Sequence, residues 1–257
     1  MVSIKSLILA VATLPLASQA TRIFYNQGTL SGWDNVFQEH NGRVSERTNV
    51  VYSGSSALKM EQTFDPSYNG RYHSEVRHNN GYRRNDNRYY GFAFRLSEGW
   101  QFQTQSYNIA QFIARRPGAG CGGDDFMPST MVWIEGNRLK TRYVNGPYSQ
   151  PNCNRGGEWS IDVGEIAAGA WHTVVIHMNW RSDSSGAMEV WLDGSRTVSR
   201  SGVATTTSDD FTFEFRVGLY ANGWFDRPGM VGSQGFREIW MDEIAIGTTY
   251  ADVNPRG

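Results

Sequence analysis

A stretch of nine residues, Gly70-Arg-Tyr-His-Ser-Glu-Val-Arg-His78, holds several side chains that can do chemistry. Along a β-strand, successive side chains point to opposite faces. One face of this strand would therefore carry Arg71, His73, Glu75 and Arg77. Two cations, an imidazole and a carboxylate pack poorly in an apolar core but suit the recognition of an anion. A solvent-exposed, salt-bridged face would use the same residues, so this strand alone leaves both interpretations open.

A second segment, Tyr107-Asn-Ile-Ala-Gln-Phe-Ile-Ala-Arg-Arg116, has an uncharged polar residue at its centre. As a strand it would turn Ala110 and Phe112 towards an apolar interior. Gln111 and Tyr107 would lie on the opposite face, where an amide can donate a hydrogen bond to a carboxylate without carrying charge. Alone, this pattern is a weak indication of a site.

A third segment, Phe213-Glu-Phe-Arg-Val-Gly-Leu-Tyr-Ala-Asn222, also alternates apolar and polar residues. Its apolar residues would face the interior, and Arg216, Tyr220 and Asn222 would share the opposite face. Gly218 would leave space for a ligand to approach the backbone beside Tyr220. Together, the three segments predict strands of one sheet whose concave outer face forms a cleft for an anionic polymer.

Period-two alternation dominates the rest of the chain and predicts an all-β fold. Turn signals such as Gly136-Asn137 and Asp193-Gly194 separate the expected strands. So many strands favour an antiparallel β-jelly-roll sandwich of two sheets, of the concanavalin-like type, with a concave cleft. Only Val163–Ala170 indicates a helical turn, and His172 and His177 are interpreted as structural. The expected strands are Thr48–Tyr52, Ala57–Gln62, Arg71–Arg77, Tyr89–Leu96, Tyr107–Ala114, Met131–Glu135, Leu139–Val144, His172–Trp180, Glu189–Leu192, Phe211–Leu219 and Phe236–Ala245.

The first twenty residues have the pattern of a signal peptide. Lys5 precedes a short apolar run from Leu7 to Leu16, and Ser18-Gln-Ala20 has the form of a cleavage site. The run is too short to span a bilayer, and no later segment is long and apolar enough to do so. We therefore expect a secreted protein without a membrane anchor, in which residues 21–257 form one domain.

The expected mature chain carries almost no net charge. Of 24 Lys and Arg residues, only Lys5 would be removed with the signal, which leaves 23 against 25 Asp and Glu. No overall field would then attract nucleic acid. The basic character is local, and arginine supplies most of it.

Cys121 and Cys153 are the only cysteines. In an exported chain, one pair of cysteines is most simply one disulfide. Both residues stand in segments rich in Gly, Pro and Asn, so the bridge would tie two long loops together across a hairpin. A metal site or a catalytic thiol is not expected from this pair.

Three short motifs resemble those of the jelly-roll alginate lyases of polysaccharide lyase family 7. His73-Ser-Glu-Val-Arg77, Gln111-Phe-Ile113 and Phe215-Arg-Val-Gly-Leu-Tyr-Ala-Asn222 resemble Arg-x-Glu-Leu/Val-Arg, Gln-Ile/Val-His and Tyr-Phe-Lys-Ala-Gly-x-Tyr-x-Gln, in the same order and spacing. The chain departs from these motifs in that Ile113 stands where a histidine is expected, and His73 opens the first motif instead. Arginine also replaces the lysine, and asparagine replaces the last glutamine. With these departures, the whole mature chain is similar to the fungal glucuronan lyases of polysaccharide lyase family 20.

This resemblance implies β-elimination in a polyuronate: the proton on C5 is removed and the oxygen on C4 leaves. The neighbouring carboxylate makes the C5 proton barely acidic until its charge is neutralised, and by the motif match Arg77 and Gln111 would do this. Tyr220 would act as the acid at the leaving oxygen. The substrate would also be bound by Arg71, Arg216, Asn222 and Tyr107.

The sequence leaves the base open. Tyr220 could serve as both acid and base if arginines such as Arg77 and Arg216 lower its pKa. His73 could be the base or could hold the substrate carboxylate. The expected activity is endo-cleavage of β-1,4-linked polyglucuronate by a monomer, with alginate as the alternative substrate.

The resemblance also suggests one structural calcium ion and no organic cofactor. Asp242 would be a ligand, near Gly54, with backbone oxygens completing the shell. An ordinary strand-end aspartate explains Asp242 almost as well.

Two other classes share the sandwich fold. A glycoside hydrolase would need two carboxyl groups flanking the scissile bond, for which Glu75 and Glu214 are the obvious candidates. A non-catalytic, lectin-like module would bind polyuronate without turning it over, and the fold alone does not exclude it.

Overall fold

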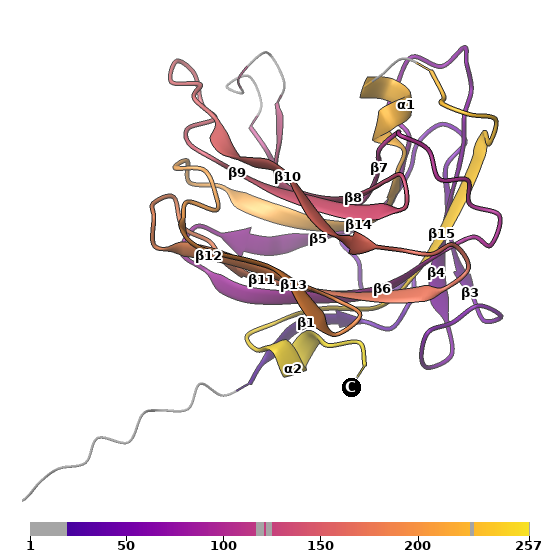
Figure 1. Ribbon diagram of the computed structural model, residues 1–257, viewed down its shortest axis with the longest axis horizontal. Coiled ribbons are helices and arrows are strands. Elements are labelled where there is room, and N and C mark those ends of the chain that lie inside the picture. Colours follow the sequence, from indigo (N-terminus) through magenta and orange to yellow (C-terminus); the bar gives the residue numbers. More distant parts are fainter. Residues whose placement is uncertain (1–19, 117–120, 122–124, 227–228, 257) are drawn as a thin grey trace, which may run out of the picture.

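Two antiparallel sheets lie face to face and make up most of the molecule (Figure 1). The computed structural model describes residues 20–116, 121, 125–226 and 229–256. Within them, one sheet has eight strands in the order β13-β12-β11-β6-β15-β4-β3, with β1 paired to β15 off this path. The other sheet has seven strands in the order β10-β9-β8-β7-β14-β5-β2.

The strands of the eight-stranded sheet are β1 (Arg22–Asn26), β3 (Arg43–Arg47), β4 (Ala57–Thr63), β6 (Asn87–Leu96), β11 (Trp171–Asn179), β12 (Gly186–Leu192), β13 (Ser195–Val203) and β15 (Phe236–Gly247). Those of the seven-stranded sheet are β2 (Asn35–Gln38), β5 (His73–Arg83), β7 (Tyr107–Arg115), β8 (Phe126–Glu135), β9 (Arg138–Asn145), β10 (Gly156–Glu165) and β14 (Thr212–Tyr220). Two short helices complete the described part, α1 (Asn222–Asp226) and α2 (Tyr250–Val253). Figure 1 shows them on opposite sides of the sandwich, each outside the sheets.

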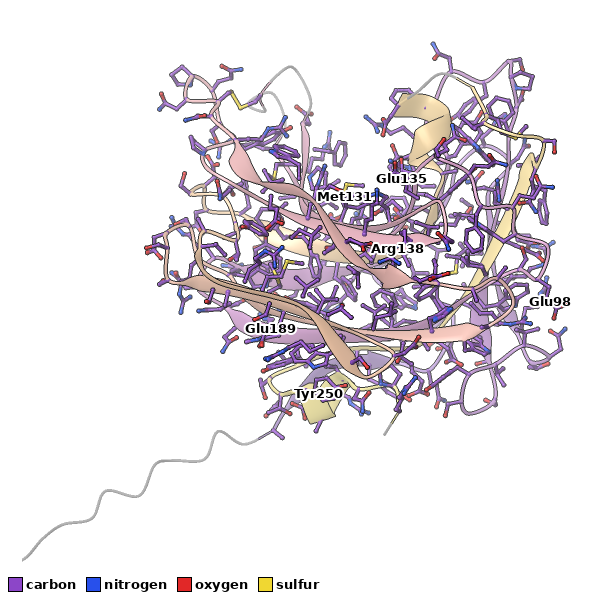
Figure 2. The ribbon with its side chains drawn as sticks, viewed as in Figure 1. Glu98, Met131, Glu135, Arg138, Glu189 and Tyr250 are labelled. Atoms are coloured by element: carbon purple, nitrogen blue, oxygen red, sulfur yellow. A yellow bond between two sulfur atoms is a disulfide. The ribbon has the colours of Figure 1, made fainter. Side chains whose placement is uncertain are left out.

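Alternation along the strands fills the space between the sheets with apolar side chains (Figure 2). The residues of β12, for example, are buried and partly exposed in strict turn. At the centre, the Tyr82 ring stacks on Trp180 at 3.6 Å and on Phe213 at 4.3 Å between centroids. The buried Tyr82 hydroxyl lies 2.6 Å from the Ser129 hydroxyl, which satisfies it inside the core. The predicted all-β sandwich is therefore confirmed.

Two of the expected elements are wrong. The segment Thr48–Tyr52 is not a strand, because the backbone N–H of Tyr52 donates to the Asp242 carboxylate rather than to a neighbouring strand. The segment Val163–Ala170 is not helical, because β10 runs on to Glu165. The remaining expected strands are present, with ends that differ by up to six residues, as in β5, which begins at His73 rather than Arg71 and runs on to Arg83.

Cys121 and Cys153 form the predicted disulfide, with their Cα atoms 5.6 Å apart. The bridge crosses the hairpin of β8 and β9, as expected, and fixes the segment that leads into β10. It thereby anchors Arg155, two residues further along the chain.

The predicted signal peptide lies almost entirely outside the described residues, which begin at Ala20. Within the described ranges, no helix has the length and apolar character needed to cross a membrane.

Candidate active site

A cavity of about 500 Å³ opens on the outer face of the seven-stranded sheet. The residues that line the cavity come from α1 and from the seven strands of this sheet or the residues next to them, so the sheet forms the floor of the cavity. Three carboxylates line it, from Glu39, Glu214 and Asp226. Six arginines face them: Arg71, Arg77, Arg115, Arg142, Arg155 and Arg216. This excess of positive charge suits an anionic ligand.

Most of the residues predicted to form the site line this cavity. They are Arg71, His73, Arg77, Gln111, Arg216, Tyr220 and Asn222. The three segments also pair as neighbours, since β14 lies between β5 and β7. The predicted cleft is thus assembled from the predicted strands.

Tyr107 is the exception, because its side chain lies in the core rather than in the cavity. It is 1% exposed, and its ring packs 5.2 Å from Trp100 and 4.8 Å from the Arg237 guanidinium. One extra residue in β7, between Asn108 and Ala110 in the pairing with β8, breaks the alternation there. The expectation that Tyr107 binds substrate is therefore wrong.

Gly218 also has a different role from the one expected. Its φ is 144°, and a Cβ placed on it would lie 2.4 Å from the Ser74 carbonyl oxygen and 2.7 Å from the Glu75 Cα. The missing side chain therefore lets β14 approach the backbone of β5, not a ligand.

The Tyr220 hydroxyl is held by Arg71. The Arg71 Nη1 donates to the Tyr220 Oη at 2.5 Å, and the Arg71 guanidinium lies 4.6 Å from the centre of the Phe225 ring. Burial raises the pKa of Tyr220 above its ordinary value, against the opposing charge of Arg71. Burial outweighs the lowering effect of Arg71, so Tyr220 is a neutral phenol at neutral pH, which suits an acid better than a base.

His73 stands directly beside Tyr220, with the two rings stacked 3.8 Å apart. The His73 Nδ1 lies 2.6 Å from the Glu39 Oε2. Although burial opposes ionisation, the hydrogen bond from His73 holds the pKa of Glu39 below its usual range. An ionised carboxylate only accepts hydrogen bonds, so Nδ1 carries a proton and Nε2 of a neutral His73 is free to accept one.

Gln111 is oriented from below by Glu75. Its Nε2 donates to both oxygens of the Glu75 carboxylate, at 2.9 and 3.0 Å. Glu75 is fully buried, and its nearest imidazole nitrogen, His73 Nε2, is 3.9 Å away. The two oxygens of one carboxylate lie too close together to be reached by the two diverging N–H groups of an amide, so a single N–H of Gln111 is shared between them. The second N–H of Gln111 remains for a ligand in the cavity.

Burial raises the pKa of the Glu75 carboxyl above its ordinary value. The folded protein therefore binds this proton more tightly than the unfolded chain, and ionised Glu75 costs stability as the pH rises above the ordinary carboxyl range. We expect Glu75→Gln to melt a few degrees higher than wild type at pH 8, with a smaller gap at pH 5. Differential scanning calorimetry at both values checks this. Glu98→Gln, at the exposed Glu98 labelled in Figure 2, is the control and should leave the melting temperature unchanged at both pH values. A Glu75→Gln protein that melts at a lower temperature than wild type at pH 8 would contradict the expectation.

Glu214 joins two of the arginines. It accepts from Arg216 Nη2 at 2.6 Å and from Arg77 Nη1 at 3.2 Å. The Phe37 ring lies under both guanidinium groups, 4.5 Å from Arg216 and 5.4 Å from Arg77. This arrangement fixes two cations side by side at the cavity floor while leaving their charge only half neutralised.

Asn222 lines the cavity but also fixes the start of α1. Its Oδ1 accepts from the Asn108 backbone N–H at 3.1 Å, and its Nδ2 donates to Ser106 Oγ and to Asp226 Oδ2. These bonds position α1 at the edge of the cavity.

Asp242 lies far from the cavity, on β15. Its buried carboxylate accepts from the backbone N–H groups of Tyr52, Ser53 and Glu243, at 2.8, 3.2 and 2.8 Å. Burial raises its pKa, and none of the described cationic side chains forms an ion pair with it. A buried anion without a cationic partner fits a metal ion beside it, but the described residues hold no cluster of three His, Cys, Asp or Glu. Backbone oxygens or water would have to supply the other ligands.

Several cavity residues gave no signal in the sequence. Glu39 stands in a polar segment, and only the fold brings it to His73. Arg142 and Arg155 line the same cavity from β9 and from the segment before β10, near the edge of the sheet opposite to β2. His172 and His177 belong to the other sheet, where they bond Asp193 and Glu189, in agreement with their structural interpretation.

The chain is similar to known polysaccharide lyases. A family model described as polysaccharide lyase matches residues 25–245. The crystal structure of an endo-β-1,4-glucuronan lyase from the fungus Trichoderma reesei has a TM-score of 0.90 and 60% sequence identity, over 91% of this chain and 99% of that chain. A family 7 alginate lyase has a TM-score of 0.49 and 11% identity, over 74% of this chain and 79% of that chain. A comparison with curated proteins gave no match. The resemblance inferred from the sequence is confirmed, and the chain belongs to the polysaccharide lyase family.

Proposed function

We propose that this polysaccharide lyase cleaves β-1,4-linked glucuronan within the chain by β-elimination. The observation that carries the proposal is the stacked pair of Tyr220 and His73, with Arg71 on the phenol, in an arginine-rich cavity. The 60% identity with a fungal endo-β-1,4-glucuronan lyase over nearly its whole length supports glucuronan as the substrate.

Neutralising the substrate carboxylate is the first requirement, because the C5 proton becomes acidic only when charge can spread into that group. Arg77, Arg216 and Gln111 lie next to one another on adjacent strands and are already held by Glu214 and Glu75. Donors fixed before the substrate arrives need no reorganisation during the reaction. We assign the carboxylate to Arg77 and to the second N–H of Gln111.

Proton transfer then falls to two neighbours. In glucuronate, the C5 proton and the C4 oxygen leave from the same side of the ring, so acid and base must stand together. His73 and Tyr220 do so. Because Tyr220 is neutral, it is suited to give a proton to the leaving oxygen, and the free Nε2 of His73 is suited to take the proton from C5.

The two alternative classes have weaker support. Glu75 is buried under Gln111, and Glu214 is bound by two arginines, so neither stands as a free carboxyl group for hydrolysis. A binding module would have no use for a histidine placed between a carboxylate and a phenol. The proposal needs only one chain, since every residue assigned a role lies on it, and we propose a monomer.

Incubation with a panel of polyuronates tests the proposed function. Glucuronan should give ultraviolet-absorbing unsaturated ends and a rapid fall in viscosity, as expected of cleavage within the chain. Faster turnover of alginate than of glucuronan would mean that alginate is the preferred substrate, while the proposed elimination reaction would still stand. New reducing ends without absorbance would refute elimination, and tight binding without product would support a binding module.

We also propose a structural calcium ion at Asp242, near Gly54. A metal bound only by the folded state stabilises it by about 2.7 kcal/mol at 100 times Kd, which raises Tm by roughly 5–10 °C in a domain of this size. Calorimetry in excess EGTA and then in millimolar Ca²⁺ should show this difference. Mg²⁺ at the same concentration is the control, because it prefers a tighter octahedral shell. Equal Tm in EGTA and Ca²⁺ would remove the proposal.

Secretion with cleavage after Ala20 is a further part of the proposal. The Thr21 backbone nitrogen lies 3.1 Å from the Asp252 Oδ2, where a free α-amino group would form an ion pair. Sequencing of the protein recovered from culture medium should therefore start at Thr21. A chain that stays in the cells and keeps Met1 would contradict this expectation.

A further inference from the structure

Arg142 and Arg155 form a second positive centre in the cavity, apart from the residues that act on the reacting sugar. Both line the cavity, with Arg142 on β9 and Arg155 just before β10. The Trp159 ring, which is 45% exposed, lies 5.3 Å from the Arg142 guanidinium and 5.7 Å from that of Arg155. The three residues are called the distal cluster below.

The distal cluster lacks the counter-charges that its neighbours have. On the same strand and the same face as Arg142, Arg138 pairs with Asp162, and Lys140 pairs with Glu135 at 3.1 Å. Across the described residues, neither Arg142 nor Arg155 has a carboxylate within ion-pair distance. The cavity end of β9 thus keeps a positive charge that the rest of the strand neutralises.

The Arg142 guanidinium also lacks hydrogen-bond acceptors for some of its N–H groups. It donates to the Pro128 carbonyl oxygen at 3.2 Å, while its Nε is buried without an acceptor. Burial, and then the charge of Arg155, lower the pKa of Arg142 to about 10, while the charge of Asp226, which also lines the cavity but forms no ion pair with Arg142, acts in the opposite direction. A cation so placed costs stability, and an anion arriving in the cavity would relieve that cost.

Register connects the distal cluster to the reacting centre. Five cavity residues are direct partners across adjacent strands, in one row that crosses the sheet. The row is Arg77, Arg216, Gln111, Met131 and Arg142. Arg142 therefore lies two strand spacings, ~10 Å, from Gln111 and about 14 Å from the strand of Tyr220. A few sugar residues of an extended polymer span this distance.

We infer that Arg142, Arg155 and Trp159 bind the carboxylate and ring of a uronate residue two or three sugars away from the bond that is broken. This subsite rests on the proposed function, because it assumes a polyuronate in the cavity. The polymer would run along the row, across the strands. Arg142 would bind the distant carboxylate by a charge-assisted hydrogen bond, and the exposed indole would pack against the sugar ring.

Substrate length separates this role from a structural one. We expect Arg142→Gln to lower kcat/KM on long-chain glucuronan about tenfold, the value of one hydrogen bond to a charged group, with most of the loss in KM. On the shortest oligosaccharide that the enzyme cleaves, the loss should be less than about twofold, because that substrate does not reach β9. Trp159→Ala, at an exposed position that tolerates truncation, should show the same dependence on length.

Arg138→Gln is the matched control. Arg138, labelled in Figure 2, stands on the same strand and face, is already paired with Asp162, and does not line the cavity. Its loss should leave both substrates within about twofold of wild type. Arg142→Gln and Trp159→Ala acting equally on long and short substrates, or no more than Arg138→Gln, would overturn the distal subsite while wild-type lyase activity stood. Absence of unsaturated product from wild type would instead remove the proposed function, and the subsite with it.

Discussion

Tyr220→Phe is expected to abolish nearly all turnover of glucuronan, by about 10²–10⁴-fold in kcat, while binding stays close to wild type. The substitution keeps the ring that stacks on His73 and removes only the hydroxyl that Arg71 holds. That hydroxyl is a neutral acid placed beside the proposed base, and burial raises its pKa further above the ordinary value. Initial rates by ultraviolet absorbance and binding by calorimetry measure the two effects separately.

Tyr250→Phe is the control for this prediction, because Tyr250 lies on α2 beyond the other sheet (Figure 2). It should leave kcat unchanged. A Tyr220→Phe enzyme that keeps more than about a tenth of wild-type kcat would show that the phenol is not the acid. Loss of a general acid is expected to lower the rate by at least about 10²-fold.

His73→Ala is expected to have the second largest effect, a loss of about 10²-fold or more in kcat. Removing the imidazole takes away the proposed base and leaves Tyr220 without its stacked neighbour. Glu39→Gln should cost less, about tenfold, because the amide keeps a hydrogen bond to Nδ1 but not the negative charge.

Chemical rescue distinguishes a base from a positioning residue. Imidazole added to His73→Ala should restore part of the activity, since it can enter the space left by the side chain and accept the C5 proton. His177→Ala, where the histidine bonds Glu189 on the other sheet, should keep wild-type kcat. A His73→Ala enzyme with normal kcat and a raised KM would assign His73 to carboxylate binding instead.

The sequence predicted the central strands well because their alternation is strong. In β14, Phe213, Phe215, Val217 and Leu219 face the core, as expected, and Arg216 and Tyr220 face the cavity. The same holds for His73 and Arg77 on β5. A strand with one face in the core and the other face lining a polar site alternates apolar and polar residues, and this alternation is easily seen in the sequence.

The strands that the sequence missed lie at the margins of the sheets. β13 and β3 end one sheet, β10 and β2 end the other, and β1 lies off the main path. Edge strands such as β13 are largely exposed, so few of their positions need to be apolar. Their pairing depends on partners far along the chain, which local patterns do not show.

The parts of the site that could not be predicted depend on contacts between side chains that are far apart in the sequence. An extra residue in β7 turns Tyr107 into the core, and period-two reasoning does not reveal such a bulge. Arg71, rather than Arg77 or Arg216, contacts the Tyr220 phenol, although all three face the same cavity. Glu39 reaches His73 only because β2 pairs with β5.

Mass spectrometry of the products from a glucuronan oligosaccharide of defined length tests the central claim most directly. Elimination moves no water into the products, so the two fragments of each cleavage should sum to the mass of the substrate, and one should carry an unsaturated end. The same cleavage by Tyr220→Phe should be nearly undetectable over the same time. Two saturated fragments whose masses sum to the substrate plus one water molecule would show hydrolysis and contradict the proposed lyase mechanism.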